Sequence, residues 1–220
     1  ARREPPRECP RCGGEVLEDV GAGTEKVAEL VRARLPAVRV DILDRDTARS
    51  PAQLVATLER FAAGSSSVLV GTQMVSKGHH FPAVTLTAVI NADNLLGYPD
   101  FRGAERTFAM LTQVAGRAGR GERAGTVVIQ THNPDHHAIR AALSHDVKGF
   151  AEVELTYRQA FRYPPAARLA LLRFESASEA AASAAAAAVA AALAQPPPGV
   201  RVVGPSPAPL ARLRGRWRVQ

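Results

Sequence analysis

The sequence predicts an α/β fold with a parallel sheet, followed by a smaller α+β domain. Helical patterns alternate with short apolar segments rich in Val, Ile and Leu over residues 24–131, and such alternation is typical of a parallel sheet. Beyond a break at Pro164 and Pro165 the pattern changes, and an alanine-rich helix stands between strands. The length of 220 residues fits one large domain or two smaller ones. We therefore expect a first lobe at 14–146 and a second part at 147–220.

The first lobe is expected to consist of four strands and three helices. Each strand is a short, continuous apolar run, as expected where both faces of a sheet are covered. The last helix places Phe108, Leu111 and Ala115 at spacings of three and four residues. In chain order we expect a helix at 24–35, a strand at 38–44, a helix at 51–63, strands at 67–72 and 84–93, a helix at 102–120 and a strand at 125–131.

The second part is expected to begin with a helix and to continue as a small α+β domain. In chain order we expect a helix at 147–163, a strand at 168–176, a helix at 177–195, a linker at Pro196–Pro198, a strand at 200–204 and a last strand near the end. We also expect the chain to be cut within an element at its end. Its start is expected to be truncated too, because a cysteine pair opens the chain without partner cysteines.

The segment QVAGRAGR, which begins at Gln113, places two glycines inside its predicted helix, where glycine is disfavoured. Gly116 and Gly119 each cost roughly 1 kcal/mol relative to Ala in a helix interior. Gln113, Arg117 and Arg120 follow one another at spacings of four and three, so they project from one face. A guanidinium pairs with phosphate oxygens in a fixed fork and stabilises the charge that develops during phosphoryl transfer. We therefore expect both arginines to face a nucleotide; the alternative is two solvated arginines at a fraying helix end.

Polar groups also follow the predicted strand at 67–72, where the loop reads TQMVSKGHHFP. Open α/β sheets bind ligands at the carboxyl ends of their strands. Thr72 could donate a hydrogen bond to a phosphate there, and Gly78, beside Lys77, could let the backbone approach it closely. An ordinary connecting loop is the alternative.

Charge and cysteine content narrow the class of protein. The net charge of +7 is concentrated at 1–12 and 164–220, which favours a nucleic-acid partner over a solvated basic tail. We expect no signal peptide, because the first ten residues lack an apolar core, and no membrane span, because the longest apolar run is mostly alanine and too short. With Cys9 and Cys12 as the only cysteines, a reducing cytoplasm fits better than a disulfide framework.

Two further clusters admit more than one interpretation. His132, His136 and His137 follow the strand at 125–131, and we interpret them as the polar start of a helix rather than as a metal site. Near the end, four arginines alternate with Leu, Gly, Trp and Val. On a single strand this pattern places all four on one face, where they could track phosphates, meet an acidic partner such as the tail of a single-strand binding protein, or remain solvated. These arginines are Arg212, Arg214, Arg216 and Arg218.

Several motifs together carry a resemblance to one family. QVAGRAGR is similar to motif VI of superfamily 2 helicases, and GTQMVSKGHHFP is similar to their motif V. The string INADNLLGYPDFRGAERTFAMLTQVAGRAGRGERAGTVVIQT, with CPRCGG and GAGTEK, resembles the PriA family of bacterial replication-restart helicases. The resemblance runs from Cys9 to the last residue and includes ELTYRQAFRYPP and GPSPAPLARLRGRWR. It implies a second RecA-like motor lobe followed by part of a C-terminal domain, with residues 1–13 ending a zinc-binding insertion.

The resemblance also implies roles for individual residues. One group matches the helicase positions that face the nucleotide across the interface between two motor lobes: Gln113, Gly116, Arg117 and Arg120. A second group matches motif V, which couples contacts with single-stranded DNA to the nucleotide: Thr72, Gln73, Lys77 and Gly78. Cys9 and Cys12 match the last Cys-x-x-Cys pair of a structural four-cysteine Zn²⁺ site, whose other pair lies upstream; a redox pair is the alternative.

The implied activity is replication restart at stalled or collapsed forks by an ATP- and Mg²⁺-dependent 3′–5′ DNA helicase. The implied partners are forked and single-stranded DNA, primosome proteins and single-strand DNA-binding protein. The protein is expected to be a monomer in the bacterial cytoplasm, at the nucleoid. This chain contains no G-x-x-x-x-G-K-[ST] phosphate loop, so it is not expected to hydrolyse ATP by itself.

One residue departs from the family pattern. His80 stands where the family usually has Asp, and it cannot supply the negative charge suited to the ribose or the Mg²⁺ surroundings. A DNA-binding restart scaffold whose motor is degenerate is therefore one alternative. Another superfamily 2 translocase is a second alternative, and it would require the upstream cysteine pairs to be absent.

Overall fold

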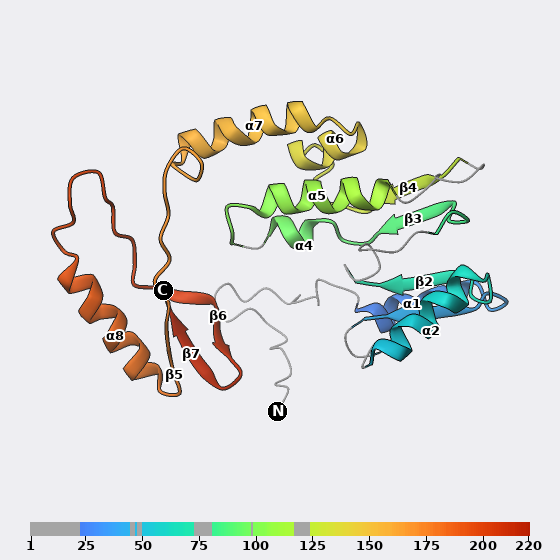
Figure 1. Cartoon of the computed structure of the whole chain (residues 1–220), viewed down its shortest axis with the longest axis horizontal. Helices are drawn as coiled ribbons and strands as arrows, with labels where there is room; N and C mark the ends of the chain where they lie inside the picture. Colours follow the sequence, from blue (N-terminus) through green and yellow to red (C-terminus); the bar gives the residue numbers. More distant parts are fainter. Residues whose placement is uncertain (1–22, 45–46, 48–49, 73–80, 98, 117–123) are drawn as a thin grey trace, which may run out of the picture. The chain divides into compact units, whose positions relative to one another are not determined.

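The computed structural model describes residues 23–44, 47, 50–72, 81–97, 99–116 and 124–220. The chain divides into two compact units, Ala1–Val153 and Glu154–Gln220, and the division falls within one helix. The elements are labelled in Figure 1. In the part of the chain that is described, no helix combines the length and the apolar character that crossing a membrane requires.

The first unit begins with two strands and the two helices that pack against them. The elements are α1 (Thr24–Arg34), β1 (Val40–Leu43), α2 (Pro51–Ala62) and β2 (Val68–Gly71). The two strands pair in parallel, with Val40 opposite Val68, as crossover through a helix requires. Helix α2 starts where its sequence predicts, because Ser50 accepts a hydrogen bond from the Gln53 amide and Pro51 occupies the first turn.

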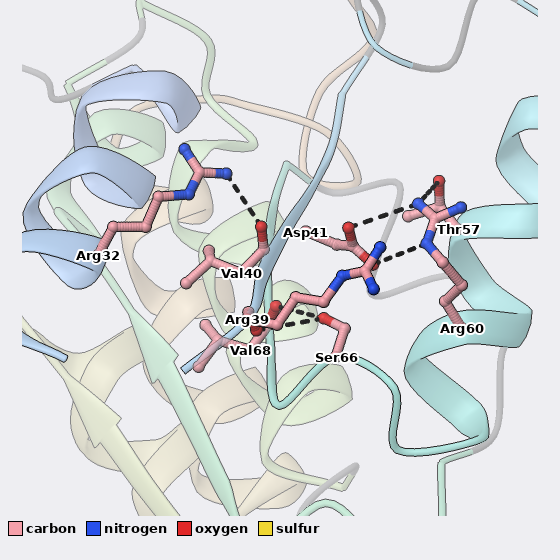
Figure 2. Close-up of polar contacts among 8 residues, drawn as sticks. All are labelled: Arg32, Arg39, Val40, Asp41, Thr57, Arg60, Ser66 and Val68. Atoms are coloured by element: carbon pink, nitrogen blue, oxygen red, sulfur yellow. Dashed lines mark hydrogen bonds and ion pairs between the residues drawn. The ribbon is translucent and has the colours of Figure 1, made fainter. Parts of the chain in front are cut away.

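Polar contacts join these elements, as Figure 2 shows. From α2, Arg60 reaches the carboxylate of Asp41 on β1 at 3.2 Å and also donates to Thr57 at 3.1 Å. Arg32 of α1 donates to the Val40 carbonyl at 2.9 Å, and the Ser66 hydroxyl donates to the Val68 carbonyl at 3.1 Å. Helices α1 and α2 are therefore tied to β1 by arginine side chains: Arg32 through a backbone carbonyl and Arg60 through a carboxylate.

A second parallel pair follows, with its own helices. The elements are β3 (Leu86–Val89), α4 (Asp93–Leu96), α5 (Gly103–Ala115), β4 (Thr126–Ile129) and α6 (His137–Leu143). Strand β3 pairs with β4, Leu86 opposite Thr126. Helix α5 packs against α6, and the core of this region contains Phe108, Leu111 and Ile139. Phe108 also stacks on Phe150 of the next helix with ring centroids 4.2 Å apart.

Helix α7 (Val147–Ala160) leads into the second unit. A three-stranded antiparallel sheet follows in the order β5-β7-β6, and α8 packs against β5 and β7. Its elements are β5 (Phe174–Ser176), α8 (Glu179–Ala192), β6 (Pro207–Leu213) and β7 (Arg216–Val219). Ser178 caps α8 by accepting from the Ala181 amide at 3.4 Å. The two buried residues of α8 are alanines, Ala182 and Ala186, so the helix can approach the sheet closely.

Several predicted elements differ from the observed ones. The strand predicted at 168–176 is reduced to β5, because β7 ends opposite Phe174 and the ladder has no described strand beyond it. Residues 200–204 form no strand, and the last strand is instead a hairpin of β6 and β7. Nor are both faces of every parallel strand covered: β3 and β4 alternate between exposed and half-buried residues, and Leu86 is 61% exposed.

Candidate nucleotide and nucleic-acid site

The carboxyl ends of the parallel strands carry polar side chains in the first unit. Asp44, which follows β1, accepts a hydrogen bond from the hydroxyl of Thr24 at the start of α1 and another from the Thr47 amide at 2.8 Å. Leu43 of β1 lies opposite Gly71 of β2, so the neighbouring strand ends at the same level. Thr72 follows Gly71 directly and is exposed. A threonine hydroxyl is therefore presented at the strand edge where open α/β sheets bind ligands.

At the next pair of strands, Asp93 joins two loops. It begins α4 after β3, and its carboxylate accepts hydrogen bonds from the loop that follows β4. The donors are the Thr131 hydroxyl at 3.0 Å, the His132 amide at 2.8 Å and the Asn133 side-chain amide at 2.8 Å. The backbone reinforces this link, because the Ala92 amide donates to the Gln130 carbonyl at 2.9 Å. The carboxyl ends of β3 and β4 are thus held together by one carboxylate.

These contacts change the pKa of Asp93. Partial burial acts to raise it, and this is the largest single influence. Hydrogen bonds from Asn133, His132 and Thr131 oppose it, together with the charge of His132, and their sum holds the pKa of Asp93 below its ordinary value. The carboxylate is therefore ionised at neutral pH, which is the state that accepts all three hydrogen bonds.

A second carboxylate lies just before α5. Arg102 donates to Asp100 through its amide at 3.0 Å and its side chain at 3.2 Å, and Arg106 is 3.0 Å away. The Arg102 side chain is the main cause that lowers the pKa of Asp100, against the opposing effect of partial burial. Asp100 also lies just before the N-terminus of α5, where the positive end of the helix dipole favours negative charge.

Helix α5 runs from this carboxylate to the QVAGRAGR segment. Leu111 is fully buried and anchors the last part of the helix in the core. Gln113 is exposed on the final turns, and the helix ends at Ala115 with Gly116 as its C-cap, whose amide donates to the Thr112 carbonyl at 3.0 Å. The helix predicted at 102–120 is therefore observed as Gly103–Ala115, and residues 117–120 of that prediction lie outside the described part of the chain. Gly116 is the C-cap and not an interior residue. It therefore does not carry the cost of roughly 1 kcal/mol, relative to alanine, that glycine has inside a helix.

The predicted site residues are only partly among the described residues. The structure places Gln113 and Gly116 together at the end of α5, and it places Thr72 at the end of β2. The remaining predicted residues lie outside the described part of the chain: Cys9, Cys12, Gln73, Lys77, Gly78, Arg117 and Arg120, together with His80 and Gly119.

Sequence reasoning missed the two strand-end carboxylates. Asp44 directly follows β1, and Asp93 lies four residues after the end of β3 at the start of α4; neither was predicted to have a role. An acidic residue at that position was the available signal. Their partners could not have been predicted, because Thr131 lies 38 residues from Asp93 and Thr24 lies 20 residues from Asp44.

The prediction of a helix start is confirmed for His136 and His137, whereas His132 lies in the loop before the helix. His136 is the N-cap of α6, and its ring Nδ1 accepts a hydrogen bond from the Ala138 amide at 3.2 Å. His137 stacks between the His136 ring at 4.5 Å and the Phe150 ring at 5.6 Å. Over the residues that the structure describes, no three His, Cys, Asp or Glu side chains gather in a way that could hold a metal ion.

The arginine-rich segment of the second unit is a hairpin rather than one strand. Arg212 lies opposite Trp217, and Leu213 lies opposite Arg216, so an arginine and an apolar residue share each face. The prediction of four arginines on one face is therefore wrong. It failed because the alternation of Arg with other residues continues unbroken through the turn, which reverses the chain at Arg214 and Gly215.

Comparison with known proteins identifies the class first. The model of the helicase conserved C-terminal domain matches residues 21–122, and the model of the primosomal protein N C-terminal domain matches residues 159–220. The chain thus contains a RecA-like helicase lobe of superfamily 2, followed by the smaller domain that the second model describes.

The relatives identify the family. Proteins named replication restart protein PriA are 41% identical to this chain in Synechocystis and 41% identical in Bacillus subtilis. The PriA of Treponema pallidum is 43% identical, and each of the three matches covers 98% of this chain. The chain belongs to the PriA family. It spans 26%, 27% and 33%, respectively, of the length of these relatives.

Proposed function

We propose that this chain is the second motor lobe and part of the C-terminal domain of an ATP-dependent helicase that acts in replication restart. The observation that carries the proposal is the similarity over 98% of the chain to proteins named replication restart protein PriA, at 41–43% identity. The helicase model also spans the QVAGRAGR segment. The substrates proposed are forked and single-stranded DNA, and the proposed partners are primosome proteins and single-strand DNA-binding protein.

In this proposal Arg117 and Arg120 face the triphosphate bound by another lobe. Support comes from the helix that precedes them: α5 is anchored in the core by Phe108 and Leu111 and ends at Ala115, two residues before Arg117. Because α5 is anchored in this way, the end of the helix at Ala115 has a fixed place beside the core of the first unit. Gln113, exposed on the final turns, is proposed to contact the same nucleotide.

Two cofactors belong to the proposal. Mg²⁺ bound with ATP would neutralise charge on the phosphates while the two arginines orient the terminal one. Cys9 and Cys12 would supply two thiolates to a structural Zn²⁺, which suits their spacing but requires two further ligands from elsewhere in the longer protein. Thr72, Gln73, Lys77 and Gly78 are proposed to couple contacts with DNA to the nucleotide, and 3′–5′ polarity is proposed as well.

The test is ATP turnover by the full-length protein, with and without forked DNA that carries a free 3′ end of the leading strand. Arg120→Ala is expected to abolish DNA-stimulated turnover and to leave DNA binding largely intact. Arg120→Lys keeps the charge but loses the planar fork, so it is expected to recover little activity. Arg106→Gln is the matched control. It also removes an arginine from the α5 region, but this arginine pairs with Asp100. Unchanged turnover in Arg120→Ala would contradict the assignment.

A degenerate motor is the second candidate, and His80 favours it. In that case the wild-type protein would bind forks tightly and show no turnover. Replacing His80 with Asp distinguishes the two, because the family residue would restore the missing negative charge. Turnover that appears only in His80→Asp would identify a restart scaffold whose motor has been lost.

A further inference from the structure

Helix α2 places an aromatic ring beside the end of the segment GTQMVSKGHHFP. The ring of Phe61, the last residue but one of α2, meets the ring of Phe81 edge to face, with centroids 5.0 Å apart and planes at 82°. Both residues are half-buried. Such a pair is favourable beyond the apolar area that it buries, and it also favours one relative orientation of the two rings. Phe81 is therefore held against the end of α2.

The end of α2 is itself fixed within the fold. Arg60, the neighbour of Phe61, donates to the Asp41 carboxylate of β1 at 3.2 Å and to the Thr57 hydroxyl at 3.1 Å (Figure 2). Leu58, one turn before Phe61, is buried. The Phe61 ring is thus presented to Phe81 from a helix end that is tied to the sheet.

This contact lies at the opposite end of β2 from Thr72. Only residues 63–67 separate α2 from Val68, where β2 begins, so the end of the helix lies near the amino end of this strand. Thr72 follows the carboxyl end of the same strand. The two described ends of the segment, Thr72 and Phe81, are therefore held at opposite ends of β2, the first by the strand ladder and the second by Phe61.

We propose that Phe61 is a positioning residue that the coupling between DNA and nucleotide requires. This inference rests on the proposed function, which assigns that coupling to residues that lie between β2 and Phe81 in the sequence. They are Thr72, Gln73, Lys77 and Gly78. A displacement that DNA causes at one end of the segment is passed on only if the other end does not yield. Phe61, by holding Phe81, provides the end that does not yield.

The experiment measures ATP turnover by the full-length protein, with and without forked DNA. Phe61→Leu removes the ring and keeps an apolar side chain, whereas Phe61→Tyr keeps the ring and serves as the conservative variant. Leu58→Ala is the matched control, because it weakens the packing of the same helix and leaves both rings in place. The quantity compared is the ratio of turnover with DNA to turnover without it, which a loss of stability alone does not change.

We expect Phe61→Leu to lower this ratio about fivefold, within the range found for substitutions that lie between coupled sites. Turnover without DNA, the KM for ATP and the affinity for the fork are expected to stay within about twofold of wild type, because Phe61 touches neither ligand in this proposal. Phe61→Tyr is expected to restore the ratio. Leu58→Ala is expected to unfold at lower urea concentration and to keep the wild-type ratio.

Hydrogen exchange in the same full-length variants measures the contact without reference to ATP. The Val84 amide donates to the Phe81 carbonyl at 3.2 Å, so it reports how firmly Phe81 is held. Phe61→Leu is expected to accelerate its exchange by up to about tenfold, which is what the loss of an aromatic pair allows. The Ala63 amide, which donates to the Glu59 carbonyl at 2.9 Å, is expected to change less.

Three outcomes would overturn the proposal. An unchanged ratio in Phe61→Leu, with faster exchange at Val84, would mean that the ring contact holds Phe81 and has no part in coupling, while the proposed function stands. An equal fall of the ratio in Leu58→Ala would assign the effect to loosening of α2 as a whole. Wild-type protein that shows no turnover with or without DNA would overturn the proposed motor function, and this inference with it.

Discussion

Helix α7 carries two ion pairs at the same spacing of four residues, and they differ in exposure and in length. The Lys148 ammonium lies 4.0 Å from Glu152, and these side chains are 90% and 68% exposed. The Arg158 guanidinium lies 2.9 Å from Glu154, and these are 13% and 9% exposed. The second pair also has its acid toward the helix N-terminus, the orientation that suits the helix dipole better. Spacing alone therefore does not determine what a charged pair contributes.

Burial explains the difference. Arg158 also donates to the Pro164 carbonyl at 3.2 Å, so its guanidinium links α7 to the turn that follows the helix. Around Lys148 water competes for both charges, and the pair gains little that solvent does not already supply. Around Arg158 the protein replaces most of that water, so each group depends on the other. The predictions below are ordered by expected loss of stability, which we expect to be larger where the charged group is more deeply buried.

The largest effect is expected at the buried pair. Arg158→Gln removes the guanidinium that lies 2.9 Å from the Glu154 carboxylate, which belongs to a residue only 7% exposed, and it weakens the contact with Pro164. We expect the free energy of unfolding of the second unit to fall by about 3 kcal/mol, the usual range for breaking a buried pair from one side. Urea unfolding, followed by Trp217 fluorescence, measures this unit through its only tryptophan.

The double variant Glu154→Leu with Arg158→Met is the control for that result. It removes both charges and keeps apolar bulk, so most of the stability lost in Arg158→Gln is expected to return. If the double variant is as unstable as the single one, the loss comes from the contact with Pro164 or from packing, and the ranking by burial of charge does not hold.

A smaller effect is expected at Asp93, which is half-buried. Asp93→Asn keeps the shape but replaces one acceptor oxygen by a donor, so at least one of its three hydrogen bonds is lost. We expect the first unit to lose about 1–3 kcal/mol, as for a hydrogen bond to a charged group. Hydrogen exchange at the His132 amide, which donates to Asp93 at 2.8 Å, is expected to accelerate more than exchange within α5. Equal exchange in the variant and the wild type would contradict the role of Asp93 in joining the two loops.

Asp93 also predicts how stability responds to acid. Its pKa is lowered in the folded state, so the unfolded chain binds more protons, and stability rises with pH across this range. The contribution is complete above the unfolded pKa of about 3.9 and is lost as the pH falls through the lower folded pKa. Asp93→Asn is expected to flatten the acid limb of the stability curve of the first unit. Asp100→Asn is expected to flatten it in the same direction, since the pKa of Asp100 is also lowered. An unchanged acid limb in both variants would contradict this assignment.

The types and order of most elements could be predicted from the sequence, because local patterns determine them. Ser50 and Pro51 mark the start of α2, and the apolar spacing of Phe108 and Leu111 marks the buried face of α5. The points at which a single residue ends a helix or reverses the chain were predicted less well. The end of α5 at Gly116 and the turn at Arg214 both fall inside patterns that continue unbroken on either side.

Sequence motifs predicted which residues belong to the candidate site, but they did not predict the hydrogen bonds between distant segments that shape it. Thr72 and Gln113 were recognised from short sequence motifs, and both are exposed at the ends of their elements. The link from Asp93 to Thr131 and Asn133 joins segments 38 to 40 residues apart, and it depends on β3 lying beside β4. Such a link follows only from tertiary structure, since no local rule relates the two segments.

The smallest effect is expected at Lys148. Lys148→Gln removes the ammonium from a pair whose members are both mainly in water, and we expect stability to change by less than about 0.5 kcal/mol. The wild-type order, with Lys before Glu, is also the weaker one on a helix, so even its small attraction is reduced. Urea unfolding at low and at high salt measures this: the difference between wild type and variant is expected to be small at low salt and absent at high salt. A loss comparable to that of Arg158→Gln would mean that spacing on α7, and not burial, sets the strength of its ion pairs.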